Sequence, residues 1–254
     1  MKLVASLITR NEAGRFLEPC IKALLEFCDE IRVIDDNSTD GSAELMEGMG
    51  VQVMRNERSV FYEHEGRARQ TLLEWTMEGE PTVVLSIDAD EFVDDGPALR
   101  KILEKPNASG VWALQMQEIW KADAQRLSVR QDGGWKEHPV GVVYWVPPDR
   151  ATNRQIRRNW VIPDRALACG RVPHIVGVWG RLNKPTVGNL LHFGWTCEAD
   201  RDARYQRYVV HDGGVHHNSD HLTSIMFDDS KVELTRRKWP KGIDKAALLK
   251  RVNE

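Results

Sequence analysis

Short apolar runs alternate with stretches of helical spacing over the first ninety residues, and this alternation is what most constrains the fold. The runs of strand length are Leu3–Ile8, Ile31–Asp35, Val51–Met54 and Thr82–Ile87. The stretches with helical spacing are Asn11–Phe27, Ser42–Met49 and Gly66–Met77. Such runs fit strands buried on both faces, and strands that alternate with helices form parallel sheets covered by helices. We therefore expect the α/β class with a mostly parallel central sheet flanked by helices.

The pattern changes after Asp88, where aromatic, β-rich stretches replace the regular alternation. Strands are expected at Val111–Ile119, Val140–Val146 and Ile175–Trp179, and helices at Pro97–Leu103 and Asp200–Val210. Eight of the nine tryptophans follow residue 110. Because indole rings bury large areas and also make platforms for sugar rings, this part should differ in role from the first. We expect one continuous domain over residues 1–254, with halves 1–95 and 96–254 and a helical region at the C-terminal end.

Composition excludes several classes of protein. The formal net charge is -3, from 35 Lys+Arg against 38 Asp+Glu, whereas binders of duplex nucleic acid normally carry a basic excess. No apolar run approaches the roughly 18–20 residues that cross a bilayer, and the chain turns polar at Thr9–Glu12 too early for a signal peptide. The four cysteines form no C-x-x-C pair, so neither a disulfide framework nor structural zinc is expected. These features predict a cytoplasmic protein without a transmembrane segment.

Polar side chains follow three of the expected parallel strands at the point where each strand ends. They are Thr9–Glu12, Asp35–Asp36 and Asp88–Glu91. Ligands of open parallel sheets bind beyond the carboxyl ends of the strands, so these groups should share one edge. If the backbone stays extended, Asp88 and Asp90 point the same way, and two adjacent carboxylates favour a cation between them. Oxygen ligands of this kind suit Mg²⁺ or Mn²⁺.

Two common nucleotide motifs are absent. No G-x-G-x-x-G follows the first strand, which disfavours a Rossmann dehydrogenase, and no G-x-x-x-x-G-K-[ST] occurs, which excludes a Walker-type NTPase. Instead, three segments, together with the helix start Gly66–Gln70, resemble the signature blocks of family 2 glycosyltransferases with the GT-A fold. The segments are Ser6–Glu12, Ile31–Ser42 and Leu85–Phe92.

The second half resembles a subgroup of this family that acts on the lipopolysaccharide core and on phage-encoded acceptors. The segments that carry this looser resemblance are Gly133–Trp135, Pro148–Arg158, Val172–His174 and Leu190–Phe193. The resemblance implies a nucleotide-sugar-binding first half and an acceptor-side second half.

The resemblance implies a nucleotide-sugar site at the strand ends. Asp36 would hydrogen-bond the nucleotide base, and the turn after the first strand would hold the base and ribose. Asp88 would lie against the ribose or the metal. The residues implied to bind the nucleotide sugar are Thr9, Arg10, Glu12, Asp36, Arg69, Asp88 and Ala89.

The resemblance also implies a divalent-metal site for Mn²⁺ or Mg²⁺. Asp90 would bind the ion that bridges the diphosphate, with Asp88 beside it. His192 follows the apolar stretch Val187–Leu191 and matches the late histidine that often completes the metal site of this fold. The residues alone leave a core or capping histidine as the alternative for His192.

An inverting transfer needs a general base that deprotonates the acceptor hydroxyl, whereas the metal stabilises the leaving diphosphate. In the family the base is an aspartate before an arginine-bearing helix, and Asp149, before Arg154–Arg158, is the nearest match. An insertion between Asp149 and Arg154 leaves Glu137 and Glu118 as alternatives.

Two further clusters have simpler explanations. The histidines at 216, 217 and 221 match no metal-binding spacing, and Gly213-Gly214 indicates a loop. Arg201, Arg204 and Arg207 have three-residue spacing, which places them on one helix face. A solvated face is the simpler interpretation, and a contact with an anionic acceptor is the alternative.

The interpretation is a metal-dependent, inverting glycosyltransferase that moves a sugar from a nucleotide diphosphate sugar, with a UDP-sugar favoured, to a hydroxyl acceptor. A saccharide, a lipid-linked glycan or a protein fits as acceptor, and peripheral attachment at the inner membrane face fits this role. One alternative is a sugar-phosphate nucleotidyltransferase, which would release pyrophosphate. The other is a non-catalytic carbohydrate-binding protein, which would bind sugar without metal and would leave the Asp88–Asp90 motif unexplained.

Asp149→Asn should lower the transfer rate by ~10²–10⁴ while donor binding stays close to normal, because a base acts on the acceptor hydroxyl. Single-turnover transfer and donor titration measure the two quantities separately. A normal transfer rate in this variant would move the base to Glu137 or Glu118.

Overall fold

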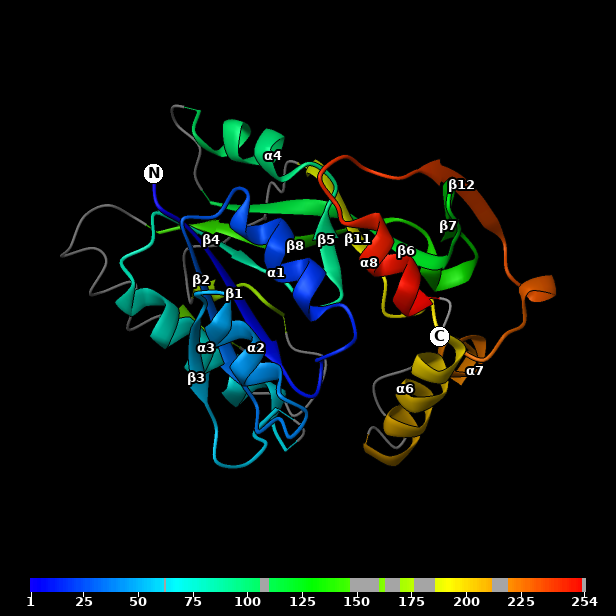
Figure 1. The fold of residues 1–254 in the computed structure, drawn as a ribbon, viewed down its shortest axis with the longest axis horizontal. Coiled ribbons are helices and arrows are strands. Elements are labelled where there is room, and N and C mark those ends of the chain that lie inside the picture. The colour runs from blue at the N-terminus through cyan, green and yellow to red at the C-terminus, as the bar shows by residue number, and fades with distance from the viewer. Residues whose placement is uncertain are drawn as a thin grey trace.

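The computed structural model describes residues 1–61, 63–105, 110–146, 160–162, 170–175, 186–211 and 219–252. Within these residues, the main sheet has ten strands and carries helices on both faces, and a second sheet has two strands (Figure 1). In the same ranges, no helix combines the length and apolar character needed to cross a bilayer.

Four parallel strands form the part of the sheet built from the first ninety residues. Their order is β4-β1-β2-β3, so the first strand of the chain is hydrogen-bonded on both sides. The strands are β1 (Leu3–Thr9), β2 (Glu30–Asp35), β3 (Gln52–Arg55) and β4 (Val83–Ser86). Every boundary lies within one residue of the expected one, and the predicted α/β class with a parallel core is confirmed.

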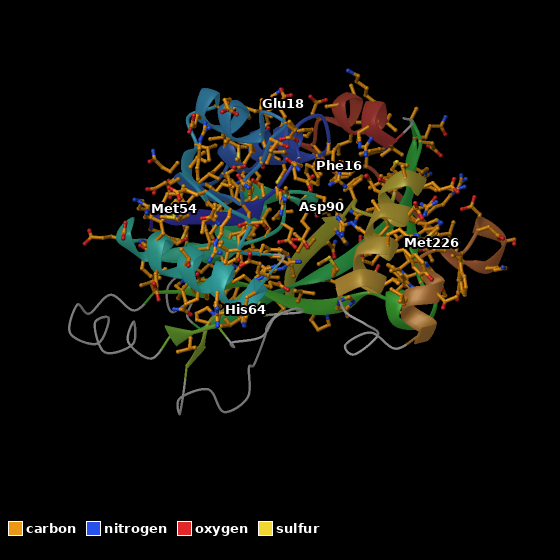
Figure 2. All side chains as sticks on the ribbon, turned by 90° about the horizontal axis from the view of Figure 1, so that it is seen from below. Phe16, Glu18, Met54, His64, Asp90 and Met226 are labelled. Atoms are coloured by element: carbon orange, nitrogen blue, oxygen red, sulfur yellow. The ribbon has the colours of Figure 1, made fainter. Side chains whose placement is uncertain are left out.

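Helices cover both faces of this parallel core. Along β4, Val83 and Leu85 join the core formed with the first two helices, whereas Val84 packs with Leu73 and Met77 of the third. Figure 2 shows these helices on opposite sides of the sheet. The first four helices are α1 (Leu17–Leu25), α2 (Ser42–Gly48), α3 (Glu65–Glu78) and α4 (Gly96–Leu103).

The helix expected over Asn11–Phe27 is shorter than predicted, because α1 begins only at Leu17. Asn11 has a left-handed φ of 54°, a conformation that interrupts a helix. The Ala13 amide donates to Asp40 Oδ2 at 2.9 Å, which ties this turn to the loop after β2. The polar residues that follow β1 are therefore in a fixed loop at the end of the sheet.

The sheet continues into the second half of the chain mainly through antiparallel pairs. From β4 the order is β8, β6, β7 and β12, while β11 pairs in parallel with β6 and antiparallel with β5. One sheet thus crosses the expected boundary near residue 95.

The remaining strands are β5 (Glu91–Val93), β6 (Val111–Ala122), β7 (Arg126–Arg130), β8 (His138–Trp145), β9 (Trp160–Val161), β10 (His174–Ile175), β11 (Thr186–His192) and β12 (Leu234–Lys238). The remaining helices are α6 (Glu198–His211), α7 (Ser219–Ser224) and α8 (Lys245–Val252), with short 3₁₀ turns η1 (Gly133–Trp135) and η2 (Asp229–Lys231).

A cluster of buried indoles stabilises the second half. Trp120, Trp135 and Trp195 are each at most 5% exposed, so of the two roles considered for these indoles, burial of apolar area applies to these three. The fully buried Arg130 lies 4.5 Å from the Trp120 ring centroid and 4.4 Å from that of Trp135. Its guanidinium also donates twice to Asp132, at 2.8 Å each. The cluster is a desolvated cation–π stack.

Arg130→Lys should lower the free energy of unfolding by about 2 kcal/mol, because an ammonium ion does not replace the guanidinium beside two indoles and cannot bind a carboxylate in two places. Urea denaturation of the whole chain measures the change. Arg126→Lys, on the same strand at an exposed position, is the matched control and should change stability by less than about 0.5 kcal/mol. Equal stability of the two variants would show that the stack contributes nothing.

Candidate active site

A pocket lies at the carboxyl ends of β1 and β4, where the polar segments predicted from the sequence meet. Asp90 lies near the middle of the molecule, between the parallel strands and the elements of the second half (Figure 2). The pocket is lined by Ile8, Thr9, Arg10, Glu12, Asp36, Phe61, Asp88, Ala89, Asp90 and Arg204. It thus contains every residue predicted to bind the nucleotide sugar except Arg69.

The backbone of the Asp88–Asp90 motif is not extended as expected. β4 ends at Ser86, and the Glu91 amide donates to the Asp88 carbonyl at 3.1 Å, which closes a turn. The two carboxylates therefore do not project in parallel from one strand. Each carboxylate is paired with different cationic side chains.

Asp88 is held by two guanidinium groups. Its carboxylate lies 2.8 Å from Arg171 Nη2 and 3.6 Å from Arg69 Nη2. Burial alone would raise the pKa of Asp88, but these two cations outweigh burial and hold the pKa below its ordinary value. Arg171 also pairs with the buried Glu91. Asp88 is therefore ionised at neutral pH without a metal ion.

Asp90 is held by cations from the second half. Arg204, on α6, donates to Asp90 Oδ2, and His192 Nε2 lies 3.5 Å from the same oxygen. Burial opposes ionisation, yet Arg204 and His192 hold the pKa of Asp90 well below its ordinary value. The turn after β4 and α6 are thereby joined through one carboxylate oxygen.

His192 lies at the end of β11, in register with Glu118 of β6. Its Nδ1 is 2.5 Å from Glu118 Oε2, so the ring bridges Glu118 and Asp90. Burial alone would lower the pKa of His192, but the two carboxylates raise it well above its ordinary value. Each ring nitrogen of His192 thus faces a carboxylate.

The carboxylates fit a metal site that a ligand completes. Within the ranges that the structure describes, no group of three or more His, Cys, Asp and Glu side chains is arranged to hold a metal. Asp88 and Asp90 both line the pocket, and Mg²⁺ is commonly held by one or two carboxylates together with substrate phosphates and water. The donor set fits a divalent ion bound with a diphosphate better than a closed protein metal centre.

Two buried oxygens of pocket-lining residues have no hydrogen-bond partner among the residues that the structure describes. They are Thr9 Oγ1 and Glu12 Oε2. The other carboxylate oxygen of Glu12 pairs with Arg15 at 2.6 Å, and burial, against the charge of Arg15, raises the pKa of Glu12 to about 7. Because buried polar atoms are usually hydrogen-bonded, these oxygens fit a ligand that carries hydroxyl donors, such as a ribose.

Asp36 has a role that the sequence did not indicate. The residue is 0% exposed, and its carboxylate accepts hydrogen bonds from the loop after β3, although it also borders the pocket. The donors are Asn56 Nδ2 at 2.8 Å, Ser59 Oγ at 2.5 Å, the Val60 amide at 2.8 Å and the Phe61 amide at 3.1 Å. Asp36 therefore fixes the loop that brings the Phe61 ring into the pocket wall.

Arg69 lies behind the pocket. Its Nε donates to Glu65 at 2.6 Å within α3, and its guanidinium lies 5.5 Å from the centre of the Phe61 ring. With its contact to Asp88, Arg69 supports two lining residues without lining the pocket itself.

The residues predicted as the general base differ in where they lie in the structure. Asp149 and Arg154–Arg158 lie outside the described residues, as do His216 and His217. Glu137 is exposed and accepts from Gln117 at 2.8 Å. Burial opposes ionisation of Glu118, but His192 holds its pKa below the ordinary value, so Glu118 is already engaged as a carboxylate.

Sequence reasoning missed three residues of the site: Phe61, Arg171 and Arg204. Only Arg204 had a signal, the three-residue spacing on α6. The interpretation of that face as solvated is wrong for the two arginines whose side chains are described, because Arg201 stacks on Trp120 at 4.3 Å and Arg204 reaches Asp90.

Asp36→Asn should loosen the loop after β3, because an amide has one acceptor oxygen in place of two and presents N–H groups to N–H donors. Leaving such buried donors unsatisfied costs about 1–3 kcal/mol each. Hydrogen exchange at the Val60 and Phe61 amides should accelerate accordingly. Glu57→Gln, at an exposed position of the same loop, should leave exchange unchanged. Unaltered protection in Asp36→Asn would remove Asp36 from this role.

Comparison with known proteins gives relatives of limited similarity. Two curated relatives, uncharacterized proteins of Mycobacterium bovis and Mycobacterium tuberculosis, are each 27% identical over 218 residues, which cover 82% of this chain and 50% of theirs. The chain thus spans about half the length of the curated relatives it matches.

Solved structures that resemble the chain include enzymes of two kinds. Glucosyl-3-phosphoglycerate synthase from Mycobacterium tuberculosis, in complex with Mn²⁺, UDP and glucosyl-3-phosphoglycerate, is 21% identical, with 46% of this chain and 44% of that chain covered and a TM-score of 0.36. Mannosyl-3-phosphoglycerate synthase from Rubrobacter xylanophilus is 27% identical, with 49% and 42% covered and a TM-score of 0.36. A 4-diphosphocytidyl-2C-methyl-D-erythritol synthase is 17% identical, with 63% and 79% covered and a TM-score of 0.39.

The comparison with protein families gives one match that spans both halves of the chain. The model of glycosyl transferase family 2 matches residues 6–171, more than half of the chain, and this range includes the carboxyl ends of β1 and β2 and the turn after β4. The chain belongs to glycosyl transferase family 2.

Proposed function

We propose that the protein is a metal-dependent, inverting glycosyltransferase that uses a nucleotide diphosphate sugar. The observation that carries this proposal is the pocket at the ends of β1 and β4, where Asp88 and Asp90 lie together with unpartnered oxygens of Thr9 and Glu12. Membership of glycosyl transferase family 2 supports the reaction type.

The donor would bind with its nucleoside against the β1 side of the pocket. Thr9 Oγ1 and Glu12 Oε2 accept hydrogen bonds from ribose hydroxyls in this proposal, which satisfies both buried oxygens. The Phe61 ring, fixed by Asp36, offers an apolar face to the base. Arg10 and Ala89 complete the wall, and a UDP-sugar is the donor we favour.

Asp90, with Asp88 beside it, would hold a Mn²⁺ or Mg²⁺ ion together with the diphosphate. When bound, such an ion neutralises the charge that develops on the leaving diphosphate. His192 would complete this set as a ligand through Nε2, the nitrogen that lies 3.5 Å from Asp90 Oδ2, while its Nδ1 is paired with Glu118.

In the transfer, the acceptor hydroxyl oxygen forms a bond to the anomeric carbon of the donor. The bond from that carbon to the diphosphate breaks, the nucleoside diphosphate leaves with the electron pair, and the hydroxyl proton passes to a general base. We assign the base to Asp149 on the family resemblance, with Glu118 and Glu137 as alternatives. Displacement from the opposite face inverts the anomeric configuration.

The acceptor belongs to the second half of the chain in this proposal, with residues 1–95 for the donor and 96–254 for the acceptor. A lipopolysaccharide-core saccharide, a lipid-linked glycan or a protein is the class of acceptor that we propose. A cytoplasmic location, with peripheral attachment at the inner membrane face, stays an expectation from the sequence.

Asp90→Asn should abolish sugar transfer while the fold is retained, because the neutral amide loses the charge that holds the divalent ion. Excess chelator should have the same effect on the unchanged protein. Release of nucleoside diphosphate from a panel of nucleotide sugars, with and without Mn²⁺, measures both. Asp202→Asn, at an exposed position of α6, should retain activity.

Full turnover in chelator or in Asp90→Asn would refute metal dependence centred on this residue. Release of pyrophosphate from a nucleoside triphosphate and a sugar phosphate would instead establish a nucleotidyltransferase.

A further inference from the structure

Arg204 enters the pocket from a part of the chain far from the parallel strands. It lies on α6, its side chain is 17% exposed, and its guanidinium lies 4.9 Å from the centre of the Trp195 ring. One of its nitrogens donates to Asp90 Oδ2. Arg204 is thus a stacked cation on the pocket wall, directly beside the carboxylate that we assign to the metal.

Gly194 provides the space for this pair. A Cβ at position 194 would overlap both Arg204 Nη2 and Asp90 Oδ2. The backbone at Gly194 has no positive φ, so its conformation does not require a glycine. The absence of a side chain at Gly194 therefore lets the guanidinium reach Asp90.

A guanidinium in this place has two possible anionic partners. In the donor-free protein its partner is Asp90, a buried carboxylate that His192 also faces, with its Nε2 3.5 Å from the same oxygen. A donor brings a diphosphate into the same pocket, and planar guanidinium groups bind phosphate oxygens strongly. The diphosphate can therefore replace Asp90 as the partner of Arg204.

We propose that Arg204 binds the diphosphate of the donor and, until the donor arrives, occupies the Asp90 oxygen that the divalent ion needs. This inference rests on the proposed function and adds the order in which the donor and the metal ion bind. Donor binding draws Arg204 from Asp90, and the freed carboxylate then accepts the metal ion. Metal and donor consequently bind with positive coupling.

The inference predicts effects of opposite sign in one variant. Arg204→Gln should bind Mn²⁺ about tenfold tighter in the absence of nucleotide, because a competing cation is gone from Asp90. The same variant should bind the nucleoside diphosphate about 10- to 100-fold more weakly in chelator, because a charge-assisted hydrogen bond to phosphate is lost. A merely structural role for Arg204 would weaken both.

The experiment uses the whole chain and three probes. Electron paramagnetic resonance measures Mn²⁺ binding without nucleotide, and calorimetry in chelator measures UDP, GDP and the corresponding nucleosides. Nucleoside affinity should not change in Arg204→Gln, since only the phosphates contact the guanidinium. Arg204→Lys should restore most of the diphosphate affinity, because the positive charge is kept.

Arg201→Gln is the matched control. Arg201 lies one turn earlier on α6 and donates to the Trp195 carbonyl at 2.7 Å, but it does not line the pocket. If Arg201→Gln reproduces both effects, they come from disturbance of α6 and the inference is wrong.

Gly194→Ala tests the geometry, with Gly188→Ala in β11 as its control, since a Cβ at 188 makes only an ordinary contact with Leu114 at 3.6 Å. Gly194→Ala should lose the positive coupling between Mn²⁺ and UDP, whereas Gly188→Ala should keep it. Coupling that survives in Gly194→Ala would overturn the proposed exchange.

The outcomes separate this inference from the proposed function. If the unchanged protein binds a nucleoside diphosphate with Mn²⁺ but Arg204→Gln behaves identically, only the role of Arg204 is refuted. If the unchanged protein binds neither UDP nor GDP with Mn²⁺, both the proposed function and the inference fail.

Discussion

The pairing of the Asp88 and Asp90 carboxylates with cations at one edge of the sheet is the interaction on which the rest of the site depends. Asp88 and Asp90 follow a buried strand, where isolated charges are costly. Their partners come from four segments: Arg69 on α3, Arg171, His192 at the end of β11, and Arg204 on α6. The second half of the chain therefore has to fold onto the first before these charges are satisfied. Because these ion pairs join the turn after β4 to residues of the second half, the pocket and the packing of the two halves are energetically linked.

This charge balance also suits a ligand that carries charges of both signs. A nucleotide diphosphate sugar with a divalent ion brings anionic phosphates for the arginines and a cation for the carboxylates, so each protein charge can exchange one partner for another. The exchange avoids exposing an unpaired charge in a buried place. The unpartnered oxygens of Thr9 and Glu12 add hydrogen-bond acceptors at the other side of the same pocket. The proposed donor thus meets both the electrostatic and the hydrogen-bonding demands of the site.

Asp36 is, like Asp88 and Asp90, an aspartate that follows a strand, but its carboxylate holds a neighbouring loop in place. Its carboxylate accepts four hydrogen bonds from the loop after β3, and a carboxylate has about four lone-pair sites in all. The geometry therefore explains a carboxylate at this position by what it does to the loop and to Phe61. A contact with the nucleotide base would have to share oxygens already in use.

The alternation of apolar runs and helical stretches determined the parallel part of the sheet to within one residue at each strand, because period and length of apolar segments are local properties. It also determined which polar residues gather at the sheet edge, since the carboxyl ends of parallel strands meet there. The tertiary structure alone decided the turn at Asp88–Glu91, the loop held by Asp36, and the partners of Asp90. Arg204 and Gly194 are more than 100 residues from Asp90 in the sequence, and no local pattern encodes which distant cation compensates a buried charge. That choice depends on the packing of α6 and its indole cluster against the sheet.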